Sequence, residues 1–158
     1  NAIAGGAFPE VHLIPLDWDQ SHTLNATINY SIGNKGISFI SQVGSGLSYT
    51  PESTTDISTI VQNSEKTPLT WNVDMLVYYN MDLFNQNIDL SCRVLNLFDH
   101  LNHTGVYSDT GVADQTKYLV QAQSQNTNEY YNTIEDWYNN ETFYSKPRYI
   151  EIGMSYAF

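Results

Sequence analysis

Five segments of the chain alternate between large apolar residues and small or polar residues with a period of two. This alternation is typical of a β-strand whose two faces meet different surroundings. In the last segment the apolar positions are filled without a gap, by Ile150, Ile152, Met154, Tyr156 and Phe158. The sequence therefore predicts an all-β chain of about five long strands, at 22–31, 37–48, 67–80, 88–98 and 147–158.

The connections between these segments are alternately short and long. The first turn, GNKG at 33–36, contains glycines and Asn that tolerate positive φ, and the link at 81–86 is also short. The connections at 49–66 and 99–146 are long, and the second is expected to contain a short helix near 128–138. This order predicts an antiparallel up-and-down meander, with tight turns at one end and long loops at the other, as in transmembrane barrels.

Composition limits the function classes. Charged residues make up 15% of the 158 residues, against about 25% in an average soluble domain, and the net charge is −11. A negative chain without clustered cations is a poor partner for nucleic acid. No apolar run reaches the roughly 18 residues of a spanning helix, but an alternating barrel strand needs no such run. The single cysteine, Cys92, excludes an internal disulfide and is interpreted as a small hydrophobic residue on the apolar face.

Strand length and strand number together favour part of a membrane barrel. About ten residues that rise by about 3.3 Å each, at a tilt of about 45°, cover roughly 23 Å, close to the apolar band of such barrels. Five strands are too few to close one, because about eight are the working minimum. A soluble sandwich would need a second set of strands, and no spare alternating segments are present. We therefore expect a C-terminal segment of a larger barrel, with external loops at 1–21, 49–66 and 99–146.

Aromatic residues stand near both ends of the predicted strands, as in the interfacial girdles of membrane proteins. Such girdles suit rings that carry a polar tip, because one side of each ring meets hydrocarbon and the other meets water. The residues expected at one rim are Tyr30, Tyr79 and Phe158, and those at the other are Tyr49, Phe98, Tyr144 and Tyr149.

Four motifs stand in one order along the chain: DWDQSHTLN at 17–25, GSGLSYTP at 44–51, VLNLFD at 94–99, and a last segment that ends in an aromatic residue. Together they resemble the C-terminal third of the barrel in TonB-dependent outer-membrane receptors. The first resembles a segment that introduces a strand, although Ser21 stands where the family usually has Arg, the second resembles the following strand exit, and the third resembles the end of the penultimate strand. The residues that carry the resemblance are Asp17, Trp18, Asp19, His22, Asn25, Asn96, Leu97, Phe98, Asp99, Asn102, Arg148 and Phe158.

The resemblance implies a barrel of about 22 strands in the bacterial outer membrane, with an N-terminal plug domain and a motif that contacts TonB. Its partners would be the lipid, the plug and upstream strands, and the barrel-assembly machinery, which would read Phe158. TonB would act only through N-terminal parts absent from this sequence. The implied activity is import of a scarce nutrient, such as an iron chelate, cobalamin, glycan or peptide, with this chain supplying pore wall and external loops.

Charged residues on the polar side of the strands are the candidate lumen-facing residues: Asp74, Asp89, Arg93 and Glu151. One interpretation makes them contacts for substrate or plug. The other makes them a solvated wall with ion pairs, in which Arg93 pairs with Asp89 or Glu151. Lysine or arginine on the lipid side would cost about 2–4 kcal/mol at mid-membrane, so the phase of each strand matters.

Other candidate sites lie in the loops. Tyr130, Tyr131 and Trp137 are candidate ligand contacts, because external loops often carry specificity, but they also suit a cap without a ligand. His100 and His103 beside Asp99 suggest a metal site, yet no third fixed ligand accompanies them, and a role in the loop or at the rim is the alternative. Asp17, Asp19 and His22 suggest a carboxylate–histidine pair or, alternatively, a shaped loop.

Three hypotheses of function follow. The first is the receptor or transporter. The second is an outer-membrane barrel without transport, such as an adhesin or anchor. The third is a soluble β-rich carbohydrate-binding module, suggested by the Tyr and Trp content. No nucleophile elbow, phosphate loop or HExxH motif is present, so neither catalysis nor a cofactor is expected.

Overall fold

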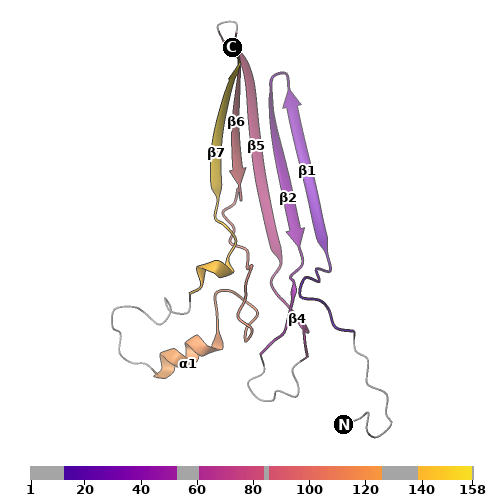
Figure 1. The fold of residues 1–158 in the computed structure, drawn as a ribbon, viewed down its shortest axis with the longest axis vertical. Helices are drawn as coiled ribbons and strands as arrows, with labels where there is room; N and C mark the ends of the chain where they lie inside the picture. The colour runs from indigo at the N-terminus through magenta and orange to yellow at the C-terminus, as the bar shows by residue number, and fades with distance from the viewer. Residues whose placement is uncertain (1–12, 53–60, 84–85, 126–138, 158) are drawn as a thin grey trace.

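A five-stranded antiparallel sheet in the order β1-β2-β5-β6-β7 is the largest element of the described structure (Figure 1). The structure, a computed structural model, describes residues 13–52, 61–83, 86–125 and 139–157. The predicted all-β class and the five-stranded meander are confirmed, because each strand pairs with the next along the sheet. The strands are β1 (Thr23–Ile32), β2 (Lys35–Gly44), β5 (Thr70–Leu83), β6 (Gln86–Leu95) and β7 (Tyr149–Ala157).

The second strand ends earlier than the sequence predicts. Strand β2 stops at Gly44, and the following residues leave the sheet, where the amide of Ser45 donates to the carbonyl of His22 at 2.8 Å. Further on, β3 (Ser48–Tyr49) pairs with β4 (Glu65–Lys66) in a separate two-stranded sheet. Alternation predicts that a segment is extended, but the partner of an extended segment is decided by contacts distant in sequence.

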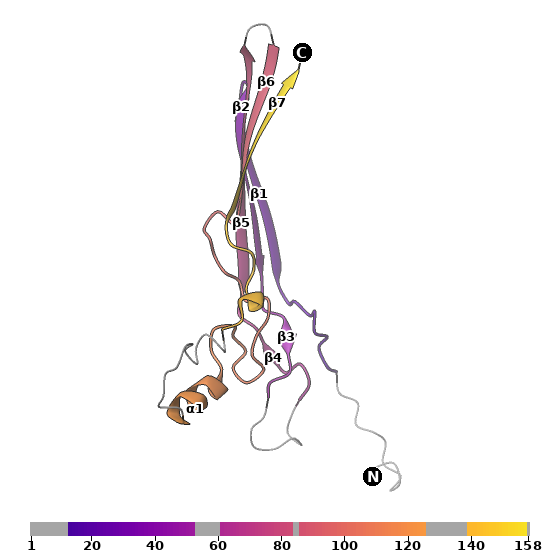
Figure 2. The ribbon, with the colours of Figure 1, turned by 60° about the vertical axis from the view of Figure 1, so that its left-hand side comes forward.

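Short connections lie at one end of the sheet and long ones at the other (Figures 1 and 2). Strands β1 and β2 are joined by two residues, Gly33 and Asn34, and Gly33 takes a φ of +59°, as glycine does at the first position of a two-residue hairpin turn. The carbonyl of Asn34 accepts from the amide of Asn80 at 2.7 Å, which ties this turn to β5. Strand β5 runs on to Leu83, so the second short connection is tighter than the sequence predicts.

The long-loop end carries helix α1 (Lys117–Gln125) and the 3-10 helix η3 (Glu141–Phe143). Thr116 is the N-cap of α1, because its hydroxyl accepts from the backbone amide of Tyr118 at 3.3 Å. The buried carboxylate of Asp109 in turn accepts from the Thr116 hydroxyl at 2.8 Å and from the Lys117 amide at 2.6 Å. The helix expected near 128–138 falls outside the described residues.

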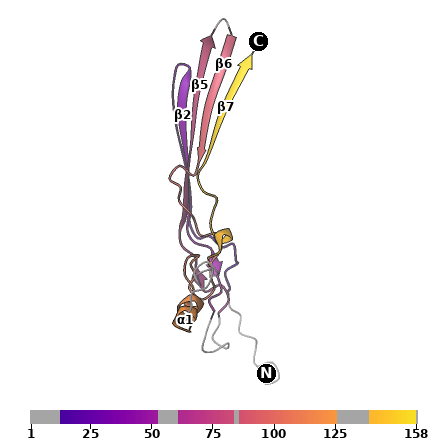
Figure 3. The same cartoon turned by 90° about the vertical axis from the view of Figure 1, so that its left-hand side faces the viewer.

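The sheet is a single layer (Figure 3), and its two faces differ in residue type. Strand register aligns the apolar positions of all five strands, so that two complete rows cross the sheet. We call this side the apolar face and the opposite side the polar face. The rows of the apolar face are Ile28-Phe39-Met75-Val94-Ile150 and Tyr30-Ile37-Val77-Cys92-Ile152.

No helix or strand of the described residues packs on the apolar face as a second layer, although Val94 within it is buried. Ile152 is 81% exposed, Met154 72% and Ile28 68%. Only Val94 and Ala113 are buried hydrophobic residues in the part of the chain that the structure describes. A soluble domain of this size derives its stability from burying such side chains, and the described residues bury few of them.

Candidate functional site

A row of three side-chain amides crosses the polar face near its long-loop end. Asn25 of β1 lies opposite Gln42 of β2, which lies opposite Asn72 of β5. The amide of Asn72 donates to Oδ1 of Asp74 at 2.8 Å. The amides of Asn25 and Gln42 make no hydrogen bond within the described residues, and both are solvent-exposed. We call these three residues the amide row.

Asn102 closes the long-loop end beside this row. Its side-chain amide takes the place of a paired residue on a neighbouring strand. Oδ1 accepts from the backbone amide of Trp71, and Nδ2 donates to the Trp71 carbonyl, each at 2.8 Å. The backbone carbonyl of Asn102 accepts from the Ser145 amide at 2.9 Å, and its amide donates to Ser145 Oγ at 3.0 Å. Asn102 therefore fixes two distant loop segments at the start of β5.

Two open hollows result where these segments meet the polar face, and Asn72, Asn102 and Ser145 line both. The first, of about 430 Å³, contains the amide row, and we call it the amide hollow. None of its lining residues is charged, and most are Asn, Gln, Thr or Ser. The second, of about 700 Å³, is lined by Asp74, Lys146 and Arg148 among others.

Asn96 organises the wall of the second hollow. It is 8% exposed and has a φ of +52°, a conformation that Asn tolerates better than most residues. Its side-chain amide donates to the carbonyls of His100 at 2.9 Å and Lys146 at 3.1 Å, and its Oδ1 accepts from the His100 amide at 2.9 Å. Its backbone amide donates to Asp74 at 2.9 Å. One residue thus joins the end of β6 to β5 and to the segment that enters β7.

The neighbouring residues of the same motif also hold these segments together at the long-loop end of the sheet. Asp99, with a φ of +56°, accepts from the Arg148 amide at 2.7 Å, and the Leu97 amide donates to the Val73 carbonyl at 2.8 Å. The structure therefore brings together motif residues from 96–99, from 102 and from 148, whose shared role here is to close the end of the sheet.

An aromatic cluster lies at the same end, around Trp71 of the apolar face. His100 stacks on Trp71 with ring centroids 4.5 Å apart, and Phe98 lies 5.7 Å away in a tilted arrangement. Phe98 therefore lies at the long-loop end of the sheet, near the strand end where the sequence predicts it. The rim prediction is wrong for Tyr149, because its pairing with Leu95 places it on the polar face.

The rim prediction also fails for two loop tyrosines. Tyr144 packs edge-on against His103 in the loops, with centroids 5.6 Å apart, and Tyr49 belongs to the small two-stranded sheet. Burial is the leading cause that raises the pKa of each of these two tyrosines. The prediction fails because distance from a strand end along the sequence does not decide which way the loop turns.

All four candidate lumen-facing residues lie on the polar face. Arg93 stands opposite Glu151, and their side chains form an ion pair with an N–O distance of 3.8 Å. Asp89 accepts instead from Ser155 Oγ at 3.2 Å. More than half of each side chain of the ion pair is exposed, which favours the solvated-wall interpretation and a contribution below about 1 kcal/mol.

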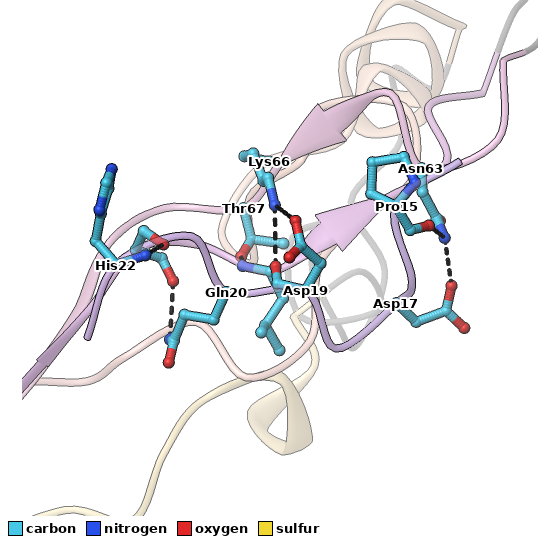
Figure 4. Close-up of polar contacts among 10 residues, drawn as sticks. Pro15, Asp17, Asp19, Gln20, His22, Asn63, Lys66 and Thr67 are labelled. Carbon is cyan, nitrogen blue, oxygen red and sulfur yellow. Dashed lines mark hydrogen bonds and ion pairs between the residues drawn. The ribbon is translucent and has the colours of Figure 1, made fainter. Parts of the chain in front are cut away.

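The first motif shapes a loop rather than a carboxylate–histidine pair (Figure 4). Asp17 accepts from the buried amide of Asn63 at 2.7 Å, and Asp19 forms an ion pair with Lys66 at 2.7 Å. The ring of His22 points away from both carboxylates in this view. Trp18 is 72% exposed. These contacts fasten the segment before β1 to the small sheet.

The two histidines of the 99–103 segment have separate contacts. His100 stacks on Trp71, and Nδ1 of His103 accepts from the Ala113 amide at 3.1 Å. Within the described ranges, no group of three or more His, Cys, Asp or Glu side chains is placed to hold a metal ion. A role in the rim for His100 and in the loop for His103 accounts for these contacts.

The two long loops contact one another through Glu52. Its carboxylate accepts from the Tyr118 hydroxyl at 2.7 Å and from Ser108 Oγ at 3.2 Å. The hydrogen bond to Glu52 is the main cause that raises the pKa of Tyr118. The candidate contacts Tyr130, Tyr131 and Trp137, like the terminal Phe158, lie outside the described residues.

Comparisons with protein-family models, with curated proteins and with solved structures found no match. No helix in the described part of the chain has the length and apolar character needed to cross a membrane.

Asn25 was identified from the sequence only as a residue of the family motif, and Gln42 and Asn72 were not singled out. Each stands at a polar position of its own alternating segment, so the sequence contained a signal for its face. The sequence contained no signal that the three residues would stand in one row, because their alignment depends on the register between strands.

Proposed function

We propose that this chain is the C-terminal part of a transmembrane β-barrel in the bacterial outer membrane, where it forms pore wall and external loops of a nutrient receptor. The observation that carries the proposal is the continuous apolar face, which is aligned over five strands and has no second layer of described helices or strands against it. Hydrocarbon is the medium that suits such a face, because it makes no hydrogen bonds and needs no matching side chains.

The distribution of charge supports the same environment. Of the charged residues in the five strands, only Lys35 stands on the apolar face, beside the short turn. The others, Asp74, Asp82, Asp89, Arg93 and Glu151, are on the polar face, as expected for a wall between lipid and a water-filled lumen. Aromatic rings stand at both ends of the apolar face, Tyr30 and Tyr79 at one and Trp71 at the other.

The edges of the sheet support further strands. The outer edges of β1 and β7 have no strand partner in the described structure. An open edge in hydrocarbon costs several kcal/mol for each bare backbone group, so membrane sheets close. We infer that upstream strands complete the cylinder, to about 22 strands if the chain is a TonB-dependent receptor.

As such a receptor, the whole protein would import an iron chelate, cobalamin, a glycan or a peptide. The polar face would line the lumen, and the loops joined through Glu52 and Tyr118 would lie outside the cell. Energy from TonB would reach the pore through a plug and contact motif encoded upstream. A barrel that serves only as an adhesin or anchor would share this sheet but lack the plug, so the upstream reading frame separates the two.

Lysine substitutions on the two faces of β7 test the membrane assignment. Ile152→Lys is expected to destabilise the inserted barrel by about 2–4 kcal/mol and to deplete it from the outer-membrane fraction, because the charge would enter hydrocarbon. Ser155→Lys in the same strand is the matched control, since it faces the lumen beside Asp89. The measurement is heat-dependent gel mobility of the protein extracted from outer membranes.

If both substitutions were tolerated equally, the proposal that the apolar face of β7 contacts lipid would be contradicted. Recovery of the unaltered protein in buffer without detergent would contradict membrane insertion altogether and favour a soluble carbohydrate-binding module.

A further inference from the structure

We propose that the amide hollow binds a neutral, polyhydroxylated ligand, namely an oligosaccharide. This inference rests on the proposed function in that the polar face is taken to line the pore. It starts from the chemistry of the lining, in which no residue is charged and most are amides or hydroxyls. Such groups donate and accept hydrogen bonds at once, as sugar hydroxyls do.

The amide row supplies hydrogen-bonding groups that the protein itself leaves free. The side-chain amides of Asn25 and Gln42 make no hydrogen bond within the described residues, whereas that of Asn72 donates to Asp74. All three project from strands, so their backbones are fixed before a ligand arrives. Adjacent strands lie about 4.8 Å apart, so a ligand lying across them meets one amide after another.

An aromatic ring extends the site at the adjoining hollow. Tyr149 stands on the polar face, is 58% exposed, and lines the second hollow, which shares Asn72 with the amide hollow. Its ring offers an apolar surface to the carbon-bound hydrogens of a sugar, with a hydroxyl at the edge. Aromatic faces beside a few placed polar groups are what a small-molecule site requires.

Charge argues against an anionic chelate in the amide hollow. Anion sites generally use Arg, Lys or backbone amides at a helix N-terminus, and none of these lines the hollow. Lys146 and Arg148 line the second hollow together with the carboxylate of Asp74. An anion is therefore the competing ligand that the experiment must include.

Titration calorimetry on the full-length protein in detergent tests the inference. The neutral probes are maltoheptaose, xylohexaose and cellohexaose, and the anionic probe is ferric tris-catecholate. We expect at least one neutral probe to bind. We expect Asn25→Ala and Gln42→Ala each to weaken its binding about three- to ten-fold, as loss of one hydrogen bond does. Asn29→Ala, the same change on the same face of β1 but away from the hollow, should alter binding less than about two-fold.

The outcomes separate the inferred oligosaccharide site from the proposed membrane-inserted receptor. Binding of ferric tris-catecholate alone, binding of no neutral probe, or equal binding by all three variants would overturn the oligosaccharide site while leaving a membrane-inserted receptor in place. Membrane insertion is measured on the same preparations by heat-dependent gel mobility. If the protein bound sugar but was purified without detergent, the oligosaccharide site would be supported and the transmembrane barrel would be contradicted.

Discussion

Asn96 is the residue on which the long-loop end of the sheet most depends. It combines a positive φ, near-complete burial and side-chain hydrogen bonds to two carbonyls and one amide. Asparagine meets all three requirements, because it tolerates the left-handed region and its short amide both donates and accepts. The carbonyls that it satisfies, of His100 and Lys146, come from opposite ends of the long loop.

Replacing Asn96 by Ala is expected to cost roughly 2–4 kcal/mol of unfolding free energy. The substitution removes these hydrogen bonds and places a Cβ-bearing residue without a polar side chain at positive φ. Asn96→Gly loses the same hydrogen bonds, but glycine adopts the positive φ without strain, so the loss of unfolding free energy should be smaller. Urea unfolding in detergent, followed by tryptophan fluorescence, measures both. Asn87→Ala, an exposed asparagine of β6, is the control, and an Asn96→Ala cost as small as this control's would contradict the assigned role.

At the scale of the element, the ring of Tyr78 in β5 lies over Gly36 of β2 on the polar face. The two residues stand opposite each other in the sheet. A Cβ at position 36 would lie 2.5 Å from Cε1 of the tyrosine ring and 2.6 Å from its hydroxyl oxygen. The ring therefore covers the backbone of β2 and compensates for the missing side chain, as aromatic residues do for glycines in sheets.

The pair can be tested by a double-mutant cycle. Gly36→Ala is expected to destabilise the protein by about 1–3 kcal/mol, because the methyl group displaces the ring. In a Tyr78→Ala background the same substitution should cost less than about 0.5 kcal/mol, since the obstacle is gone. Thermal unfolding in detergent gives the four stabilities. Equal costs of Gly36→Ala in the two backgrounds would show that the glycine serves another purpose.

At the scale of the whole molecule, the connections are sorted by length. The two short ones share one end of the sheet, while the loops that contain Glu52, α1 and η3 share the other (Figure 1). In a barrel inserted through the assembly machinery the short turns face the periplasm and the long loops face outward. The hydrogen bonds between the loops then form a cap on the external side.

Proteinase K added to intact cells should therefore cut this protein in the connection between β6 and β7. Long exposed loops are preferred cleavage sites, and the two-residue turn of β1 and β2 would be shielded behind the membrane. An antibody against the C-terminal strand detects the released fragment. Cells lysed before digestion serve as the control. Protection of the loop, with cleavage at the short turns, would reverse the proposed orientation.

The sequence by itself determined the strands, their faces and the order of short and long connections. These properties follow from a period-two pattern that each segment carries alone, as in the run from Ile150 to Met154. Even the pairing of Arg93 with Glu151 was among the predicted alternatives, because both share a face in neighbouring segments.

Only the tertiary structure decided which residues of different segments meet. Asn25, Gln42 and Asn72 form one row because of strand register, and a shift by one residue would send each to the other face. Asn96 and Asn102 close the sheet through bonds to segments 50 and 43 positions further along the chain. Such contacts depend on the path of the whole loop, and local alternation contains no information about that path.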